Sequence, residues 1–171
     1  MAAWEINRFV TINGPDSIVE LNDEAILTNK TLTAPAVNNP ILQGTKEKWN
    51  VVGSAATGTI NFNILTSTAW IYTTNATANW TLNVRGSESS TLNSVLATND
   101  SVTIAFAAAQ GTTAYYNNVF QIDTTTITPR WQGALPPSAG NASSHDVYTY
   151  TIIKTAATPT YVVYAARTRF A

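Results

Sequence analysis

The chain has 171 residues, a formal net charge of −1 and no cysteine, and only 11% of its residues are charged. This length is enough for one domain with a buried core and an additional segment. The small net charge gives no long-range attraction for nucleic acid or for an anionic membrane surface. The lack of cysteine excludes disulfides and thiolate metal sites.

Thr and Asn supply much of the chain's polarity, whereas the strong helix formers Glu, Lys and Arg are scarce. Thr favours strands because it is β-branched, and Asn favours turns. The composition therefore predicts an all-β protein. The first residues, "MAAWEINRFVTING", contain Glu5 and Arg8 and no long apolar run. We accordingly expect no signal peptide and no membrane insertion, with synthesis in a cytoplasm.

Residues 1–48 differ from the rest of the chain because prolines interrupt them at Pro15, Pro35 and Pro40. Proline removes a backbone donor and favours an extended conformation in the residue before it. Apolar residues recur here, but they are too sparse to form a core within one chain. Those that we expect to pack between copies are Leu32, Val37, Ile41 and Leu42. The segment is predicted to be an extended arm for docking or for homotrimer formation, and the alternative is a flexible linker.

Residues 49–171 show the alternation of apolar and polar side chains that is typical of strands. In "TGTINFNILTSTAWIYTT", Ile60, Phe62 and Ile64 alternate with Asn61 and Asn63. Similar alternation follows in "ANWTLNVRG", "SVTIAFAAAQG", "TAYYNNVFQID", "TTTITPRWQ", "DVYTYTIIKT" and "TYVVYAARTRF". The pattern predicts about eight strands at the spacing of a sandwich or barrel.

The connecting segments "NAT", "GSESS", "ATND" and "QGTT" have the composition of turns. Short turns between neighbouring strands indicate hairpins and hence an antiparallel sheet. We therefore predict an antiparallel, jelly-roll-like β-sandwich for residues 49–171, with residues 1–48 as its extended arm. A hydrated face rich in Thr and Asn could also pack against a copy of itself.

The run Ser143, Ser144, His145 and Asp146 contains every residue type of a serine-hydrolase triad. A triad needs these side chains to converge beside an oxyanion hole. Neighbours on an extended chain point to opposite sides, and the sequence has no Gly-x-Ser-x-Gly elbow. His145 is also the only histidine of the chain, so it has no second histidine with which to share a metal. We interpret this run as a loop that enters a strand at Asp146.

The acidic residues in the segment 49–171 indicate turns rather than a catalytic pair. Glu88, Asp100, Asp123 and Asp146 each lie near a predicted turn, whereas a glycosidase needs two facing carboxylates in a cleft. No calcium loop, zinc motif or Gly-rich phosphate loop is present. We therefore expect a protein that is not an enzyme, with no catalytic residues, no cofactor and no metal.

Aromatic residues offer a different kind of site. Tyr115, Tyr116 and Trp131 lie near predicted strand ends or loops, and an aromatic face can stack on a sugar ring. They are the candidates for surface aromatic contacts with a glycan. The alternative is that they bury area in the core or between subunits.

A longer stretch runs "NSVLATNDSVTIAFAAAQGTTAYYNNVFQIDTTTITPRWQGALPPSAGNASSHDVYTYTIIKTA" and continues to the end, about residues 90–171. Its distinctive residues are spread over several predicted strands and loops. They comprise Gln110-Gly111, Tyr115-Tyr116, Phe120 to Asp123, Pro129, Trp131 to Gly133, Pro137 to Asn141, Asp146 to Tyr148 and Thr151 to Lys154. In these residues the stretch resembles a module in the structural proteins of marine cyanobacterial tailed phages.

The arm phrase "NKTLTAPAVNNPILQGT" also resembles stalk phrases of trimeric phage fibres. Together these resemblances imply a virion structural or tail-fibre-like protein with no enzymatic activity. The expected partners are two further copies in a homotrimer and other virion proteins of the capsid or tail. A decoration, a capsid fibre and a short tail fibre all fit, and a carbohydrate- or receptor-binding tip is the alternative. The expected location is the virion, assembled in the host cytoplasm.

Overall fold

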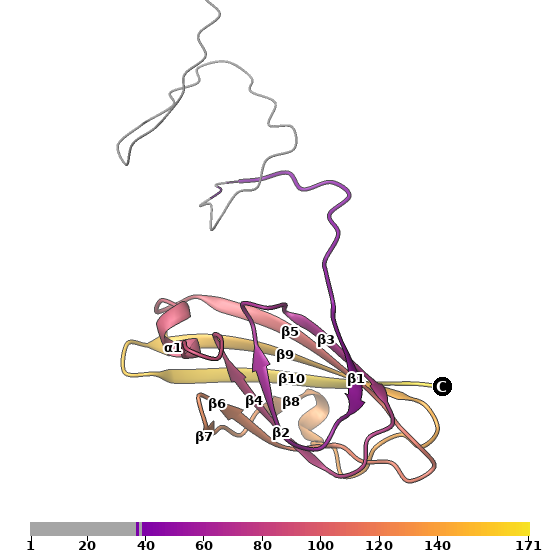
Figure 1. Cartoon of the computed structure of the whole chain (residues 1–171). Coiled ribbons are helices and arrows are strands. Elements are labelled where there is room, and N and C mark those ends of the chain that lie inside the picture. The colour runs from indigo at the N-terminus through magenta and orange to yellow at the C-terminus, as the bar shows by residue number, and fades with distance from the viewer. Residues whose placement is uncertain (1–36, 38) are drawn as a thin grey trace, which may run out of the picture. The chain divides into compact units, whose positions relative to one another are not determined.

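The computed structural model describes residue 37 and residues 39–171. Gly44–Ala171 form one compact unit, called the head below, which includes the domain predicted for residues 49–171. The head consists almost entirely of strands in two sheets (Figure 1), as the all-β prediction requires. Most of the predicted arm, including Leu32, lies outside the described residues.

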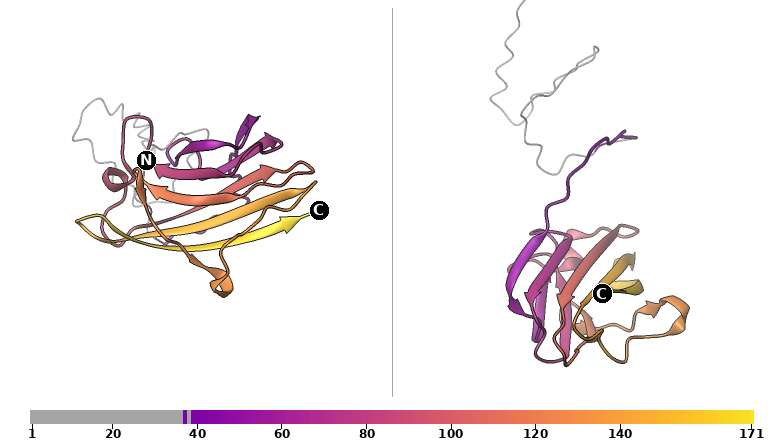
Figure 2. Two further views of the ribbon diagram at one scale, coloured as in Figure 1. Left: turned by 90° about the horizontal axis from the view of Figure 1, so that it is seen from below. Right: turned by 90° about the vertical axis from the view of Figure 1, so that its right-hand side faces the viewer.

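The strands follow the alternation in the sequence closely. They are β1 (Asn50–Ala55), β2 (Gly58–Asn63), β3 (Ala69–Thr74), β4 (Trp80–Arg85), β5 (Ser101–Ala109), β6 (Asn117–Ile122), β7 (Thr125–Thr126), β8 (Arg130–Trp131), β9 (His145–Ala156) and β10 (Thr160–Phe170). Two short helical segments complete the described part: α1 (Leu92–Val95) and the 3-10 turn η1 (Gln132–Ala134). In Figure 2 the orange segment after β6 loops out from the sheets, and within it β8 pairs in parallel with β10.

Consecutive strands alternate between the two sheets from β1 to β6. One sheet has the order β1-β3-β5-β9-β10-β8, and the other has the order β2-β4-β6-β7. The pairs β1–β3, β3–β5, β2–β4 and β4–β6 are all parallel. The chain therefore winds as a flattened coil, in which each turn adds one strand to each sheet.

The antiparallel, jelly-roll-like prediction is wrong for these first six strands. Short connections such as Ala56-Thr57 carry the chain across to the opposite sheet, so they are not hairpin turns. The next strand in the same sheet then runs in the same direction. Antiparallel pairing does occur later, where β9 pairs with both β5 and β10, and where β7 pairs with β6. The β6–β7 hairpin turns at Asp123 and Thr124, both with positive φ, as a type I′ turn requires.

The core lies between the two sheets and is rich in aromatic rings. Phe62 of one sheet lies 4.9 Å from Trp70 of the other, measured between ring centroids. Trp80, which is fully buried, contacts both Phe106 and Tyr148 at 5.8 Å. Such ring pairs stabilise a core beyond the area that they bury, and here they join the two sheets.

The four-residue helix α1 is held at both ends by side chains that are distant in sequence, one from the β6–β7 turn and one from β9. The Asp123 carboxylate accepts hydrogen bonds from the backbone nitrogens of Leu92 at 2.7 Å and Asn93 at 3.0 Å. The Lys154 ammonium, only 6% exposed, donates to the carbonyl oxygens of Asn93 at 2.8 Å and Leu96 at 2.7 Å. A negative charge at the N-terminus and a positive charge at the C-terminus satisfy backbone groups that a helix leaves unpaired.

Replacing Lys154 by methionine is expected to lower the free energy of unfolding by about 1–3 kcal/mol, since two inward-facing carbonyls lose a charged donor. Chemical denaturation of the purified chain measures this change. Lys46→Met is the control, because Lys46 is exposed. Equal effects of the two substitutions would contradict the role given to Lys154.

Candidate functional site

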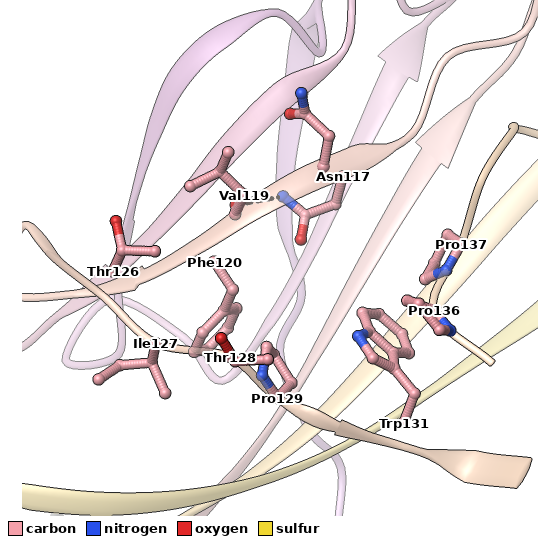
Figure 3. Close-up of a pocket in the computed structure, with 11 residues that line it drawn as sticks. Asn117, Val119, Phe120, Thr126, Ile127, Thr128, Pro129, Trp131, Pro136 and Pro137 are labelled. Carbon is pink, nitrogen blue, oxygen red and sulfur yellow. Dashed lines mark hydrogen bonds between the residues drawn. The ribbon is translucent and has the colours of Figure 1, made fainter. Parts of the chain in front are cut away.

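A groove lies beside Trp131 and is called the Trp131 groove below (Figure 3). It has a volume of about 220 Å³. Its lining comes from β6, β7, β8 and the loops that follow them: Asn117, Asn118, Val119, Phe120, Thr126, Ile127, Thr128, Pro129, Trp131, Pro136 and Pro137. Small-molecule sites usually occupy about 300–1,000 Å³. The groove is therefore sized for one small group or for the side of an extended ligand.

Trp131 serves the core as well as the groove. Its ring meets the ring of Tyr150 edge to face at 5.8 Å and 72°, and it is half-buried against the hydrophobic core. Tyr150 in turn stacks on Phe120 at 4.5 Å. Figure 3 shows the indole beside Pro136 and Pro137, with Pro129 and Phe120 toward the other end of the groove. The indole is fixed by packing, and part of it remains available to a ligand.

Tyr115 and Tyr116 do not join Trp131 in this groove, because neither residue lines it. Both are half-buried and pack against the core. The Gln110 side chain holds the backbone of Tyr115 at two points. Its Nε2 donates to the Tyr115 carbonyl oxygen at 2.8 Å, and its Oε1 accepts from the Tyr115 nitrogen at 2.9 Å.

Several residues far apart in the sequence meet around this contact, in a group called the Gln110 latch: Gln110, Tyr115, Gly140, Asn141 and Asp146. Asp146, which is fully buried, accepts from Asn141 N at 2.9 Å and from Gln110 Nε2 at 3.3 Å. Gly140 lies directly against the Tyr115 backbone. The latch joins the end of β5, the Tyr115 loop, the loop before β9 and the beginning of β9. Its contacts therefore hold two loops in place.

Asn117, which is 4% exposed, links the two sheets through its side chain. Its Nδ2 donates to the carbonyl oxygens of Trp80 at 2.9 Å and Val119 at 2.8 Å, and its Oδ1 accepts from the Tyr150 hydroxyl at 2.7 Å. The backbone nitrogen of Asn117 also donates to the Tyr148 hydroxyl at 3.3 Å. Buried polar groups cost stability unless they are paired, and here each side-chain atom has a partner.

Two buried tyrosines on β9 have perturbed acidities. Burial, and to a smaller extent the Asp146 carboxylate, raises the pKa of Tyr148 to about 12 from 10.0. Hydrogen bonds from Asn117 and Arg167 act in the opposite direction. Burial also raises the pKa of Tyr150 well above its ordinary value. Desolvation disfavours the phenolate, so both groups stay neutral in the folded head.

These pKa shifts predict alkaline destabilisation. Because the folded pKa of Tyr148 exceeds its unfolded value, its contribution is fully present below pH 10.0 and is lost as pH rises through about 12. The shift corresponds to about 2–3 kcal/mol for Tyr148. Urea unfolding across this range, followed with tyrosinate absorbance, measures the loss. Tyr148→Phe should flatten the curve, and a stability that does not change between pH 10.0 and about 12 would contradict the prediction.

The Ser-His-Asp run does not converge. His145 is exposed and Asp146 is fully buried at successive positions of β9, as the alternation predicts. Ser143, Ser144 and His145 line one open hollow together with Gln110, but Asp146 is not part of its lining. Among the described residues, no group of three or more His, Asp or Glu side chains could hold a metal ion. Within the same residues, no helix is long and apolar enough to cross a membrane.

The apolar residues predicted to pack between copies are exposed where they are described. Val37 is 58% exposed, Ile41 is 96% exposed and Leu42 is 73% exposed. Leu32 lies outside the described residues, so its predicted role is not examined by the structure. Three large apolar side chains within six positions leave considerable apolar surface uncovered.

The sequence reasoning missed the polar residues that organise the head: Gln110, Asn117 and Lys154. Each is buried although its type is ordinarily exposed. One signal was available for Lys154. In "YTYTIIK" the even positions from Tyr148 to Ile152 form the apolar face, and Lys154 continues that face inward. For Gln110 and Asn117, flanking turns conceal the alternation.

Comparison with protein-family models, with curated proteins and with solved structures gave no significant match to this chain.

Proposed function

We propose that the chain is a non-enzymatic structural protein of a bacteriophage particle, assembled in the host cytoplasm. It acts as a homotrimer that decorates the particle surface, as a capsid fibre or as a short tail fibre. Residues 1–48 dock onto other virion proteins or intertwine with their copies, and the head projects outward.

The observation that carries this proposal is the exposed apolar run Val37, Ile41 and Leu42. Single exposed apolar residues are ordinary, but three large ones within six positions offer apolar surface that contact with another chain would bury. The prolines nearby favour extended backbone, which lets side chains of several chains pack along one axis. Because the copies have the same sequence, the apolar residues of each chain would lie at the same level along that axis as those of its neighbours.

The Gln110 latch supports the proposal that the chain has a structural function. The residues with which the chain resembles phage structural modules include Gln110, Gly140, Asn141 and Asp146. In the head these residues hold loops in place through backbone contacts. A structural function accounts for these residues without requiring that they catalyse a reaction. Lack of cysteine also fits oligomerisation as the source of added stability.

Light scattering of the purified full chain tests the proposal. The expected mass is three times the 18.4 kDa of one chain. Changing both Ile41 and Leu42 to serine should weaken the trimer, seen as dissociation at higher concentration. Leu135→Ser is the matched control, since Leu135 is 79% exposed on a loop of the head. A monomeric full chain would refute trimer formation.

The Trp131 groove favours one other function, a carbohydrate- or receptor-binding tip for host adsorption. The indole and the prolines of the groove offer flat apolar surfaces, and Asn118, Thr126 and Thr128 add polar groups at its margin. Glycan-array binding that is lost in Asn118→Ala with the fold intact would support this function. If the trimer bound no glycan on the array at any concentration, this would count against the binding function.

A further inference from the structure

A short loop between β8 and β9, residues 132–138, is fixed at both ends and only weakly held between them. Before it, Trp131 lies in β8, which pairs with β10. After it, the Arg167 side chain donates to the carbonyl oxygen of Ala139. Both ends of this segment, called the 132–138 loop below, are therefore anchored to the head.

The middle of the 132–138 loop has few contacts of its own. Its backbone closes through a hydrogen bond from the Leu135 nitrogen to the Gln132 carbonyl oxygen, which is long at 3.5 Å. The two prolines of the loop have no N–H to donate, and residues 132–136 are all exposed. A segment with exposed backbone and few buried contacts can change its conformation at a low cost in free energy.

Two consecutive residues at the start of the loop have left-handed backbone conformations. Gly133 has a φ of 66° and Ala134 has a φ of 57°. Glycine adopts this conformation freely, whereas the Cβ of alanine disfavours it. Strained residues of this kind cluster at ligand clamps and switch regions. A return of Ala134 to negative φ would relieve the strain and redirect the chain at Leu135.

Leu135 follows this pair and is 79% exposed. It lines a hollow of about 170 Å³ to which Trp131 and Pro137 also contribute. The same two residues line the Trp131 groove, so the hollow and the groove are neighbours. Leu135 is not part of the groove lining, although the next residue, Pro136, is. A local change of backbone direction is therefore sufficient to bring Leu135 to the groove.

The Trp131 groove offers apolar partners to a leucine side chain. The apolar residues in its lining include Phe120, Ile127, Pro129 and Trp131. In Figure 3 the prolines of the 132–138 loop lie beside the indole, and Thr128 lies toward the other end of the groove. Burial of a leucine removes apolar area from water and favours the contact. The exposed side chain and the apolar groove are thus chemically matched.

We propose that the 132–138 loop is a lid for the Trp131 groove, and that the structure shows the lid open. In the closed position Ala134 leaves the left-handed region and Leu135 packs into the groove toward Thr128. The lid controls whether a ligand can reach the indole. This inference deepens the binding function proposed for the groove and rests on it for its purpose, but movement of the loop can be measured without a glycan.

The test uses the fact that the chain has no cysteine. Leu135→Cys is combined with Thr128→Cys in the full chain, and with Thr59→Cys as the control. All three residues are exposed, and Thr59 lies on β2, the edge strand remote from the groove. A disulfide requires Cα atoms within about 7 Å of each other. Under oxidising conditions the first pair should form a bond within one chain, and the control pair should not, as read by mobility on a non-reducing denaturing gel.

Fluorescence gives a second measurement of closure. Oxidation of the Leu135→Cys/Thr128→Cys pair should lower the quenching of tryptophan fluorescence by acrylamide, because the closed loop covers the Trp131 indole. The difference should vanish when Trp131→Phe is added. Quenching that is the same before and after oxidation would overturn the lid.

The outcomes separate the lid from the binding function. Glycan binding without a disulfide in the Leu135→Cys/Thr128→Cys chain would leave the binding function standing and overturn the lid. A disulfide in a chain that binds no glycan would support the movement and remove the binding function. Equal disulfide formation in the test and control pairs would also overturn the lid, because it would show unfolding rather than closure.

Discussion

Gly140→Ala is expected to destabilise the head by about 2–3 kcal/mol, near the upper end of the usual cost of overpacking. A Cβ at this position would lie 2.9 Å from the backbone nitrogen and from the carbonyl carbon of Tyr115, and closer still to its carbonyl oxygen. Backbone atoms cannot rotate away as a flexible side chain can. Relief requires the Tyr115 loop to move, which would break the two hydrogen bonds from Gln110.

Gly53→Ala is the matched control for this substitution, because no atom lies within 4 Å of a Cβ built there. Alanine in a strand is neutral or slightly favourable relative to glycine. Urea denaturation of both variants measures the difference in the free energy of unfolding. If Gly140→Ala were as stable as Gly53→Ala, the Tyr115 loop would not be held as described.

Asn117→Leu should have the second large effect, a loss of about 3 kcal/mol. The substitution keeps a similar volume but leaves the Trp80 and Val119 carbonyls and the Tyr150 hydroxyl without their side-chain partner. Leaving buried polar groups unpaired costs about 1–3 kcal/mol each, with part recovered by relaxation. Asn118→Leu is the control, because Asn118 is the exposed neighbour on the same strand.

A double-mutant cycle separates the parts of this network. Tyr150→Phe removes only the hydroxyl that donates to Asn117 Oδ1, so the Tyr150→Phe and Asn117→Leu effects should be less than additive. Contacting residues in one network commonly couple by about 0.5–3 kcal/mol. Fully additive effects would show that the Tyr150 hydroxyl and Asn117 act independently.

Local pattern was sufficient to predict the strands but not their pairing. Alternation at Ile60, Phe62 and Ile64 indicates which side of β2 is buried, because side chains alternate along any strand. Pairing depends on where the chain goes at Ala56-Thr57, and a short turn-rich link is compatible with a hairpin or with a crossing to the other sheet. Parallel pairing within so short a distance arises only because the chain coils through both sheets.

The aromatic candidates illustrate a similar limit. Position near a loop indicated that Trp131 could be accessible, and the residue does border a groove. The same reasoning placed Tyr115 and Tyr116 with it, yet they lie elsewhere and pack against the core. Whether two loops meet depends on side chains far apart in sequence, such as Gln110 and Asp146. No local pattern contains that information.

The Gln110 latch gives a physical explanation for the residue pattern from Gln110 to Asp146. Gly140 permits a close backbone contact, Asn141 supplies a backbone donor and Asp146 receives it. The side chain of Arg167 also donates to the carbonyl oxygen of Ala139 in the same loop. A serine-hydrolase site would need the His145 and Asp146 side chains on one side of the chain, whereas the latch requires them on opposite sides.

Location of the chain on intact phage particles tests the central claim most directly. Purified particles, labelled with an antibody against the head and imaged, should carry the chain at regular positions, in multiples of three copies. Positions on the capsid would identify a decoration or capsid fibre, and positions at the tail would identify a tail fibre. Particles that contain no copy of the chain would contradict the proposed structural function.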